Sequence, residues 1–452
     1  MKKSLILSPQ QFTLLTLLFT CVITNTLNAQ QLPPKVEQWS ILHCGTLLAI
    51  PGVVPQEKVS IIVKDGRIVE LRKGYVKLSS LKTEKDAKVT IIDLKRSFVL
   101  PGLIDCHTHI TFEMSRQSRL NRVTETDADA AIKSVVYAKR TLDAGFTTIR
   151  NVGSGGDAAF ALRDAINSGL VPGPRILVAG EAITATGGHG DGTLGFRDDL
   201  FDIPGAMQGV ADGPDECRKA VRSQVKRGAD VIKLTATGGV LSQTAAGTDQ
   251  QFFDDELKAI MDTAHLLGRK VAAHAHGTDG INAALRAGVD SIEHGSFLDD
   301  ESIRLFNQTG AFLVPTLLAG KTVVELAKIK GFFPPAIVAK ANAVGPVIKD
   351  AFARAYKGGV NIAFGTDSGV SKHGQNAEEF LIMVDAGMSE MDAIVCATIN
   401  AAELCGLANE IGTIEAGKAA DIIALANDPL ENISSLKNVW FVMRNGVIHK
   451  QP

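Results

Sequence analysis

The sequence is poor in aromatic residues and has almost no excess charge. Only 5% of its 452 residues are aromatic, with three tyrosines and two tryptophans, and the formal net charge at pH 7 is -2. No basic tract stands out, so neither nucleic acid nor an anionic membrane surface is an expected partner. A small-molecule ligand is expected instead.

The sequence also lacks an apolar run long enough for a confident membrane span. Residues 14–23 are apolar, but they follow Lys2 and Lys3 and lead into a polar segment near Ala29. This order is typical of a secretory signal and is too short and too interrupted for an ordinary transmembrane helix. We expect residues 1–30 to direct bacterial-type export to the periplasm or medium. An uncleaved anchor is the alternative; after cleavage no membrane contact is expected.

Cysteines are few and form no recognisable disulfide framework. Beyond the signal segment the chain has five, an odd number, at wide spacings: Cys44, Cys106, Cys217, Cys396 and Cys405. A chain of this length can stabilise its core without disulfides. These thiols are therefore expected to be small buried side chains.

Glycine and apolar residues are plentiful, and from about residue 100 they recur in one pattern. A helical stretch, a glycine and a short apolar strand follow one another in "LDAGFTTIR", "KRGADVIKL", "LLGRKVAAH", "LRAGVDSIE", "NQTGAFLVP" and "YKGGVNIAF". With "SFVLPGLIDCHTH" and "RILVAG" the pattern predicts eight strands, mostly alternating with helices. Near-continuous apolar strands between helices indicate a parallel sheet. We expect an α/β fold with a (β/α)8 TIM barrel over residues 100–405.

The two flanks do not follow this pattern. Residues 31–99 and 406–452 contain short strand-like runs, with hairpin turns at Asp65-Gly66 and Asn445-Gly446. We expect both ends to join in one small composite β-sandwich beside the barrel.

Polar residues gather at the predicted C-terminal ends of the strands, where such barrels carry their functional groups. The sequence has ten histidines, and five of them lie at three strand ends. Each residue alone has an ordinary explanation: a satisfied core histidine, a turn aspartate, or a salt bridge at the rim for the arginine. Together they predict a site containing His107, His109, Arg150, Lys233, His274, His276, His294 and Asp367.

Lys233 lies inside the apolar strand "VIKL", and the nearest acid along the chain is Asp230. A buried unpaired ammonium is costly, so this lysine should lose its proton, meet a distant carboxylate or carry a modification. If its neutral amine adds carbon dioxide, the anionic carbamate can bridge two cations. Two metals sharing a hydroxide would then activate water and polarise a carbonyl. Asp367 is placed to act as base and later as acid toward the leaving amine.

The segments "PGLIDCHTH", "VIKLTATGG", "VAAHAHG", "SIEHGSF" and "FGTDSG" resemble the amidohydrolase superfamily, in its binuclear branch with a carboxylated lysine. Within it the chain is most similar to the enzymes related to imidazolonepropionase that include Xaa-Pro dipeptidases. The resemblance implies two divalent metals, with zinc expected, and carbon dioxide or bicarbonate for N6-carboxylation of the lysine. The implied ligands are His107, His109, Lys233, His274, His294 and Asp367, the last also catalytic.

The sequence indicates less about the substrate than about the metal site. Many members of the superfamily have Asp where this chain has Asn151, which leaves the role of Arg150 in doubt. His189 in the glycine-rich loop after the third strand, His276 and Arg150 are candidate substrate contacts, and either His274 or His276 could be the ligand. The apolar "VPTLLAG" favours a hydrophobic or prolyl group. We expect hydrolysis of an amide in a dipeptide such as Xaa-Pro.

Other functions remain open. An N-acyl amino acid is the alternative amide substrate. From other classes, Lys233 could form a Schiff base in a lyase, or the barrel could bind metal without catalysis. Assembly into a homo-oligomer is also left open.

Overall fold

The middle of the chain forms short parallel strands separated by helices. The computed structural model describes residues 36–242 and 247–451. The strands coincide with the eight that the sequence predicts: β5 (Leu103–Thr108), β6 (Phe146–Asn151), β7 (Arg175–Val178), β8 (Val231–Thr235), β9 (Lys270–Ala275), β10 (Ser291–His294), β11 (Phe312–Val314) and β12 (Asn361–Ile362).

These strands pair in chain order as two parallel sheets, one of β5 to β7 and one of β8 to β12. Two isolated parallel bridges link the sheets: Ile183 with Leu234 on one side, and Thr108 with Ser368 on the other. The carboxyl ends of strands far apart in the sequence therefore come together.

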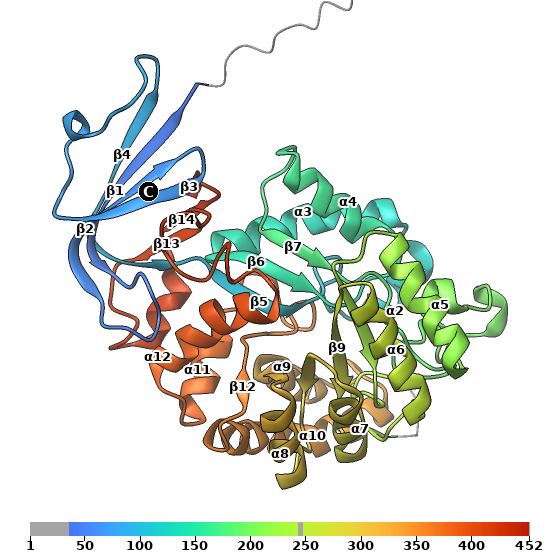
Figure 1. Ribbon diagram of the computed structural model, residues 1–452. Helices are drawn as coiled ribbons and strands as arrows, with labels where there is room; N and C mark the ends of the chain where they lie inside the picture. The colour runs from blue at the N-terminus through green and yellow to red at the C-terminus, as the bar shows by residue number, and fades with distance from the viewer. Residues whose placement is uncertain (1–35, 243–246, 452) are drawn as a thin grey trace, which may run out of the picture.

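Helices lie outside the strands, as Figure 1 shows. They are α2 (Ser118–Thr124), α3 (Asp127–Asp143), α4 (Ala158–Asn167), α5 (Gly213–Lys226), α6 (Asp254–Leu266), α7 (Thr278–Ala287), α8 (Asp300–Thr309), α9 (Leu317–Ala327), α10 (Pro335–Lys357), α11 (Glu378–Asp385), α12 (Glu390–Val395) and α13 (Ala401–Leu404). The glycines expected between helix and strand do follow the helices. Gly288 and Gly310, for example, end α7 and α8 with left-handed φ of 94° and 75°. Buried apolar residues of strands and helices form one large core between them.

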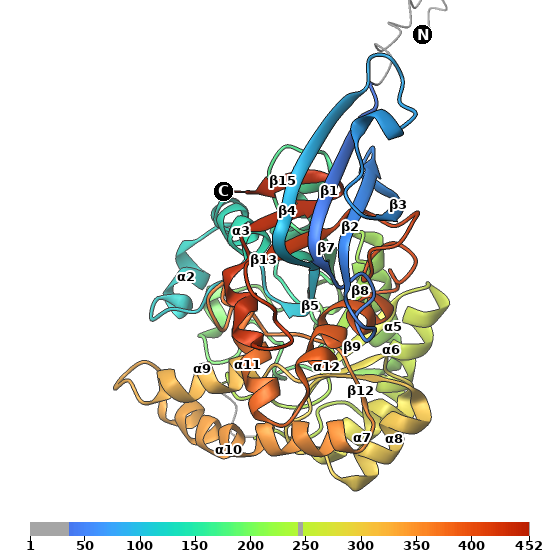
Figure 2. The same cartoon turned by 90° about the vertical axis from the view of Figure 1, so that its left-hand side faces the viewer.

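The two chain ends build a separate sheet at one side of the molecule, where blue and red strands lie together in Figure 2. Its seven strands have the order β15-β14-β13-β4-β1-β2-β3. They are β1 (Gln38–Leu47), β2 (Gln56–Lys64), β3 (Arg67–Lys73), β4 (Lys88–Pro101), β13 (Ile422–Leu425), β14 (Phe441–Arg444) and β15 (Val447–Lys450). The predicted joining of both ends is confirmed.

The expected sandwich is instead one continuous hydrogen-bonded sheet. β4 is long enough to pair with β1 along most of its length and with β13 through Phe98–Pro101. A second cluster of buried apolar residues, from both chain ends, packs on this sheet. Both predicted hairpin turns are present, with positive φ at Asp65-Gly66 and Asn445-Gly446.

The sequence also predicts a signal segment, the absence of an ordinary transmembrane helix, and buried free thiols. The predicted signal segment, residues 1–30, lies outside the described residues. Within residues 36–242 and 247–451, no helix is long and apolar enough to cross a bilayer. The five cysteines of this part are free thiols, and four of them are buried, as the sequence predicts.

Candidate metal and active site

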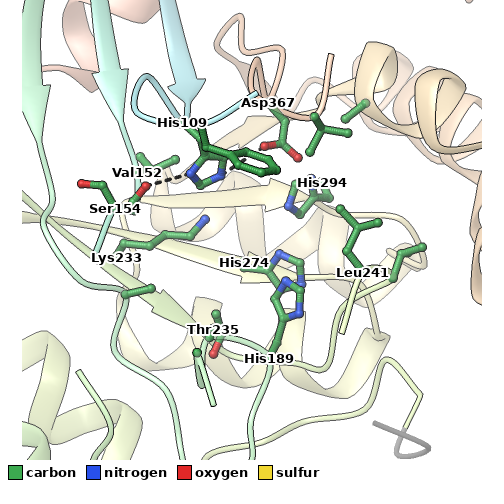
Figure 3. Close-up of a pocket in the computed structure, with 18 of the residues that line it drawn as sticks. His109, Val152, Ser154, His189, Lys233, Thr235, Leu241, His274, His294 and Asp367 are labelled. Carbon is green, nitrogen blue, oxygen red and sulfur yellow. Dashed lines mark hydrogen bonds and ion pairs between the residues drawn. The ribbon is translucent and has the colours of Figure 1, made fainter. Parts of the chain in front are cut away.

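A cavity of about 630 Å³ opens at the carboxyl ends of the parallel strands. Its wall includes nearly every polar residue that the sequence places there: His107, His109, His189, Lys233, His274, His276, His294 and Asp367. Figure 3 shows the side chains of His109, Lys233, His274, His294 and Asp367 converging on one space. The parallel strand order brings them together although they come from positions as far apart as His107 and Asp367.

The first group of potential metal ligands is His107, His109 and Asp367. Both histidines lie at the end of β5, where side chains two residues apart share a face. Asp367 Oδ1 lies 3.5 Å from His107 Nε2 and 3.2 Å from His109 Nε2. Asp367 has a left-handed φ of 55°, and its backbone N–H donates to the His107 carbonyl at 2.7 Å. This turn therefore aims the carboxylate at both imidazoles.

The second group is His274, His276 and His294, at the ends of β9 and β10. Their nearest ring nitrogens all lie within 4.8 Å of one another. The group contains one histidine more than the predicted ligand pair, because His276, just past the end of β9, stays close to His274. His294 has a left-handed φ of 74°, rare for a residue other than glycine, which marks it as a functional position.

Four of the five imidazoles are fixed through their Nδ1 atoms. The partners are Glu293 Oε2 for His107 (2.7 Å), the Gly153 carbonyl for His109 (2.9 Å), Ser296 Oγ for His276 (2.7 Å) and Thr316 Oγ1 for His294 (2.6 Å). The Glu293 carboxylate and the Gly153 carbonyl can only accept, so they place the proton on Nδ1 of His107 and His109 and leave Nε2 with its lone pair, as metal-ligating histidines require. The Ser296 and Thr316 hydroxyls can accept in the same way.

Four of these histidines are held in the neutral form that metal binding needs. Burial, assisted by nearby Lys233, lowers the pKa of His107 to about 4. Burial also lowers the pKa of His276 to about 4 and lowers the pKa values of His274 and His294 well below their ordinary range.

Lys233 is buried in β8 and its Nζ has no hydrogen-bond partner within residues 36–242 and 247–451. Burial lowers its pKa to about 8, although Glu293 and Asp367 oppose the shift. Its side chain extends into the space between His109 and His274 (Figure 3). His274 Nε2 is likewise buried without a partner among the described residues. A buried polar atom without a hydrogen-bond partner lowers the stability of the fold, and a bound cation would give these nitrogen atoms a partner. The donor set therefore fits bound cations.

Two buried carboxylates position the first group and were not predicted as site residues. Glu293 accepts from Arg150 Nη2 at 2.9 Å and from Ser291 Oγ at 2.6 Å, in addition to contacting His107. Burial alone would raise the pKa of Glu293, but Arg150 and His107 bring it down to about 2. A charged residue inside an apolar strand is the signal that singled out Lys233, and it applies equally to Glu293.

The second of these carboxylates is Asp105, in β5. It accepts from the backbone N–H of His107 (3.0 Å), from the Thr366 hydroxyl (2.6 Å) and from Asn376 Nδ2 (2.7 Å). Asp105 thus ties the residue before Asp367 to the strand that carries both first-group histidines.

The expectation that Arg150 contacts the substrate does not agree with its placement. Arg150 is 1% exposed and is absent from the cavity wall. Its guanidinium donates to the Cys106 carbonyl (2.7 Å), Ser291 Oγ (3.1 Å) and Glu293. The buried Glu293 carboxylate holds it beneath the histidines, a partner that sequence spacing could not identify.

His189 comes from the glycine-rich loop after β7 and reaches the cavity as expected. Its ring stacks on His274 with centroids 4.2 Å apart, and its Nδ1 has no partner among the described residues. Burial lowers its pKa to about 3. Gly239 lies against this ring, because an added Cβ would be 2.2 Å from His189 Cε1.

Another side of the cavity is apolar. It includes side chains from α9, α10 and the segment after β8: Val240, Leu241, Ala319, Val323, Ala341 and Val344. Thr316 and Ala319 come from the predicted apolar segment "VPTLLAG".

Comparisons with known proteins agree with this site. The family model described as the amidohydrolase family matches residues 98–449. The chain belongs to the amidohydrolase family. Ochratoxinase of Aspergillus niger is 31% identical over 467 residues, which cover 96% of this chain and 92% of that protein. The predicted relation to imidazolonepropionase is confirmed as a distant one: the protein of Symbiobacterium thermophilum is 24% identical over 389 residues, 81% of this chain and 83% of that one.

Two solved structures have the same architecture. A Xaa-Pro dipeptidase with bound methionine in its active site is 43% identical, with a TM-score of 0.86 over 91% of this chain and 100% of that one. A prolidase complexed with n-methylphosphonate-l-proline is 32% identical, with a TM-score of 0.82 over 92% and 100% of the two chains. With its two candidate metal sites, the chain is a metal-dependent amidohydrolase acting on carbon–nitrogen bonds.

Proposed function

We propose that this protein is a binuclear metal-dependent dipeptidase that cleaves a Xaa-Pro or similar amide bond. The observation that carries the proposal is the pair of histidine groups facing one buried lysine in a single cavity. Two divalent cations, zinc being the expected pair, would be held by His107 and His109 on one side and His274 and His294 on the other, with Lys233 and Asp367 contributing to the site. When bound, the cations supply an activated water and polarise the scissile carbonyl.

Lys233 joins the two groups in this proposal as an N6-carboxylated residue. Because burial lowers the pKa of Lys233 to about 8, a sizeable fraction of its amine is neutral near physiological pH, and the neutral amine is the form that adds carbon dioxide. The bond forms between Nζ and the carbon of carbon dioxide, and the amine proton leaves to solvent. The resulting anion would replace a costly buried ammonium by a group that cations stabilise.

Asp367 is the proton carrier. Burial would raise its pKa, but His107, His109 and Lys233 lower it, so the carboxylate is ionised and able to accept a proton from the attacking water. The same carboxyl then donates that proton to the leaving amine nitrogen. Its position beside both first-group imidazoles keeps it next to the reacting atoms.

The cavity wall favours an uncharged side chain on the substrate. The α9–α10 side offers only small and aliphatic groups, which suit an apolar or prolyl residue. The methionine in the related dipeptidase and the proline phosphonate in the related prolidase are ligands of that kind. His189 and His276 are proposed to contact the substrate amide, and an N-acyl amino acid is the alternative substrate.

We also propose that the parallel strands close into a barrel and that the protein is exported. The bridges between the two parallel sheets support a closed eight-stranded barrel over residues 100–405. The pattern of residues 1–30 supports export to the periplasm or medium.

The test is metal content together with turnover. Protein purified without chelator should contain about two divalent metals per chain and cleave members of a panel of Xaa-Pro dipeptides and N-acyl amino acids. Removal of metal should abolish cleavage, and zinc or manganese with bicarbonate should restore it. Metal-free protein with no gain on adding these reagents would reject the binuclear site, and activity without metal would favour a Schiff base at Lys233.

A further inference from the structure

The cavity contains one arginine, Arg122, on α2. Within residues 36–242 and 247–451 its guanidinium makes no hydrogen bond and no ion pair of 4.0 Å or less. Two other basic side chains near the cavity already have partners: Arg150 is paired with Glu293 beneath the histidines, and Lys340 donates to the carbonyls of Gly239 (2.7 Å) and Ser242 (2.6 Å). Lys233 is assigned to the metal site. Arg122 is therefore a free five-donor group in the cavity wall.

The two acids whose charges raise the pKa of Arg122, Glu181 and Asp191, form their hydrogen bonds with other groups. Glu181 Oε1 accepts from the Gly156 N–H at 3.1 Å. Asp191 accepts from the Gly187 N–H at 2.9 Å and from the Thr193 hydroxyl at 2.7 Å. Arg122 remains exposed to solvent; desolvation of its guanidinium by the surrounding protein lowers its pKa, against the raising effects of the Glu181 and Asp191 charges.

The loop after β7 leaves room for this side chain. A Cβ added at Gly192 would lie 2.4 Å from Arg122 Nη2, so the absence of a side chain there lets the guanidinium reach the wall. Gly190, Gly192 and Thr193 line the cavity next to it. The loop that carries His189 therefore also accommodates Arg122.

We propose that Arg122 binds the free carboxylate of the substrate and thereby selects substrates with an unblocked C-terminal residue. This inference rests on the proposed function. Arginine pairs with carboxylates through two parallel, charge-assisted hydrogen bonds. Arg122 takes the role that the sequence suggested for Arg150, and the apolar α9–α10 side takes the uncharged part of the substrate.

The experiment compares a carboxylate with its uncharged counterpart on the metal-loaded enzyme. The probes are L-methionyl-L-proline and L-methionyl-L-prolinamide, and binding of N-methylphosphonate-L-proline is measured by calorimetry without turnover. The variants are Arg122→Gln and Arg122→Lys, with Arg116→Gln as control. Arg116 is exposed, lies outside the cavity wall and has the ring of Phe332 at 5.8 Å, so its replacement removes a charge nearby without touching the proposed contact.

Arg122→Gln should raise KM for the dipeptide about tenfold or more, as expected for loss of a charge-assisted pair, with kcat little changed. KM for the prolinamide should stay the same, and Arg122→Lys should recover part of the loss. The phosphonate should bind the Gln variant about tenfold more weakly and the Arg116→Gln control normally.

Equal effects on both probes, or none, would overturn the role of Arg122 and leave the proposed function intact. A wild-type protein that carries metal but neither cleaves the amide panel nor binds the phosphonate would reject the proposed function, and this inference with it.

Discussion

Replacing Glu293 by glutamine should weaken metal binding through His107. The Glu293 carboxylate can only accept hydrogen bonds, so its 2.7 Å contact requires the proton on His107 Nδ1 and leaves Nε2 free for a cation. A glutamine oxygen can still accept from Arg150 and Ser291, but its NH2 group would then face His107. As a donor it favours the other tautomer, in which Nε2 carries the proton.

The expected loss is about 10- to 100-fold in metal affinity, the usual effect of removing such a partner. This corresponds to about 1.4 to 2.7 kcal/mol. The assay is zinc competition against a chelator of known affinity, with folding checked by circular dichroism. Ser291→Ala is the matched control, because it removes the 2.6 Å hydrogen bond to Glu293 but leaves the carboxylate on His107. Equal affinities for wild type and Glu293→Gln would refute the tautomer argument, as would an equal loss in Ser291→Ala.

Glu293→Gln should also change how the stability of the protein depends on pH. Arg150 and His107 hold the pKa of Glu293 at about 2, against the raising effect of burial. An acid whose pKa is lowered by folding stabilises the fold above its ordinary pKa of about 4.3, and the contribution disappears as the pH falls toward 2. In metal-free protein the stability difference between wild type and Glu293→Gln should therefore shrink over that range. A difference that stays constant in denaturant titrations from pH 5 to 2 would contradict the buried ion pair.

Three other substitutions test the remaining parts of the site. Lys233→Ala should lose at least one metal per chain while keeping its fold, and retention of both metals with full activity would exclude a bridging role. Asp367→Asn should lower kcat about 100- to 10,000-fold because an amide cannot carry the proton, and normal turnover would assign that step to another group. Gly239→Ala should push the His189 ring off His274, because its Cβ would meet that ring at 2.2 Å. The expected result is a raised KM with normal metal content, and unchanged kinetics would show that His189 does not position the substrate.

Much of the fold could be predicted because it depends on local pattern. The eight strands follow from short apolar runs, and the helix ends from glycines whose left-handed φ other residues rarely adopt. The pairing of β4 with both β1 and β13 could not be predicted as one sheet. It depends on the length and course of β4, which decide whether two short sheets or one continuous sheet forms.

The sequence by itself determined which polar side chains lie at the strand ends. Alternation along a strand places His107 and His109 on one face, and the parallel strand pattern brings them near His274, His294 and Asp367. Only the tertiary structure decided the partners of buried charges. Glu293 pairs with Arg150, 143 residues away, and contacts His107, 186 residues away. The pairing with Glu293 holds Arg150 outside the substrate cavity. Pairing across such separations depends on strand register and side-chain packing in three dimensions, which the spacing of residues along one strand does not specify.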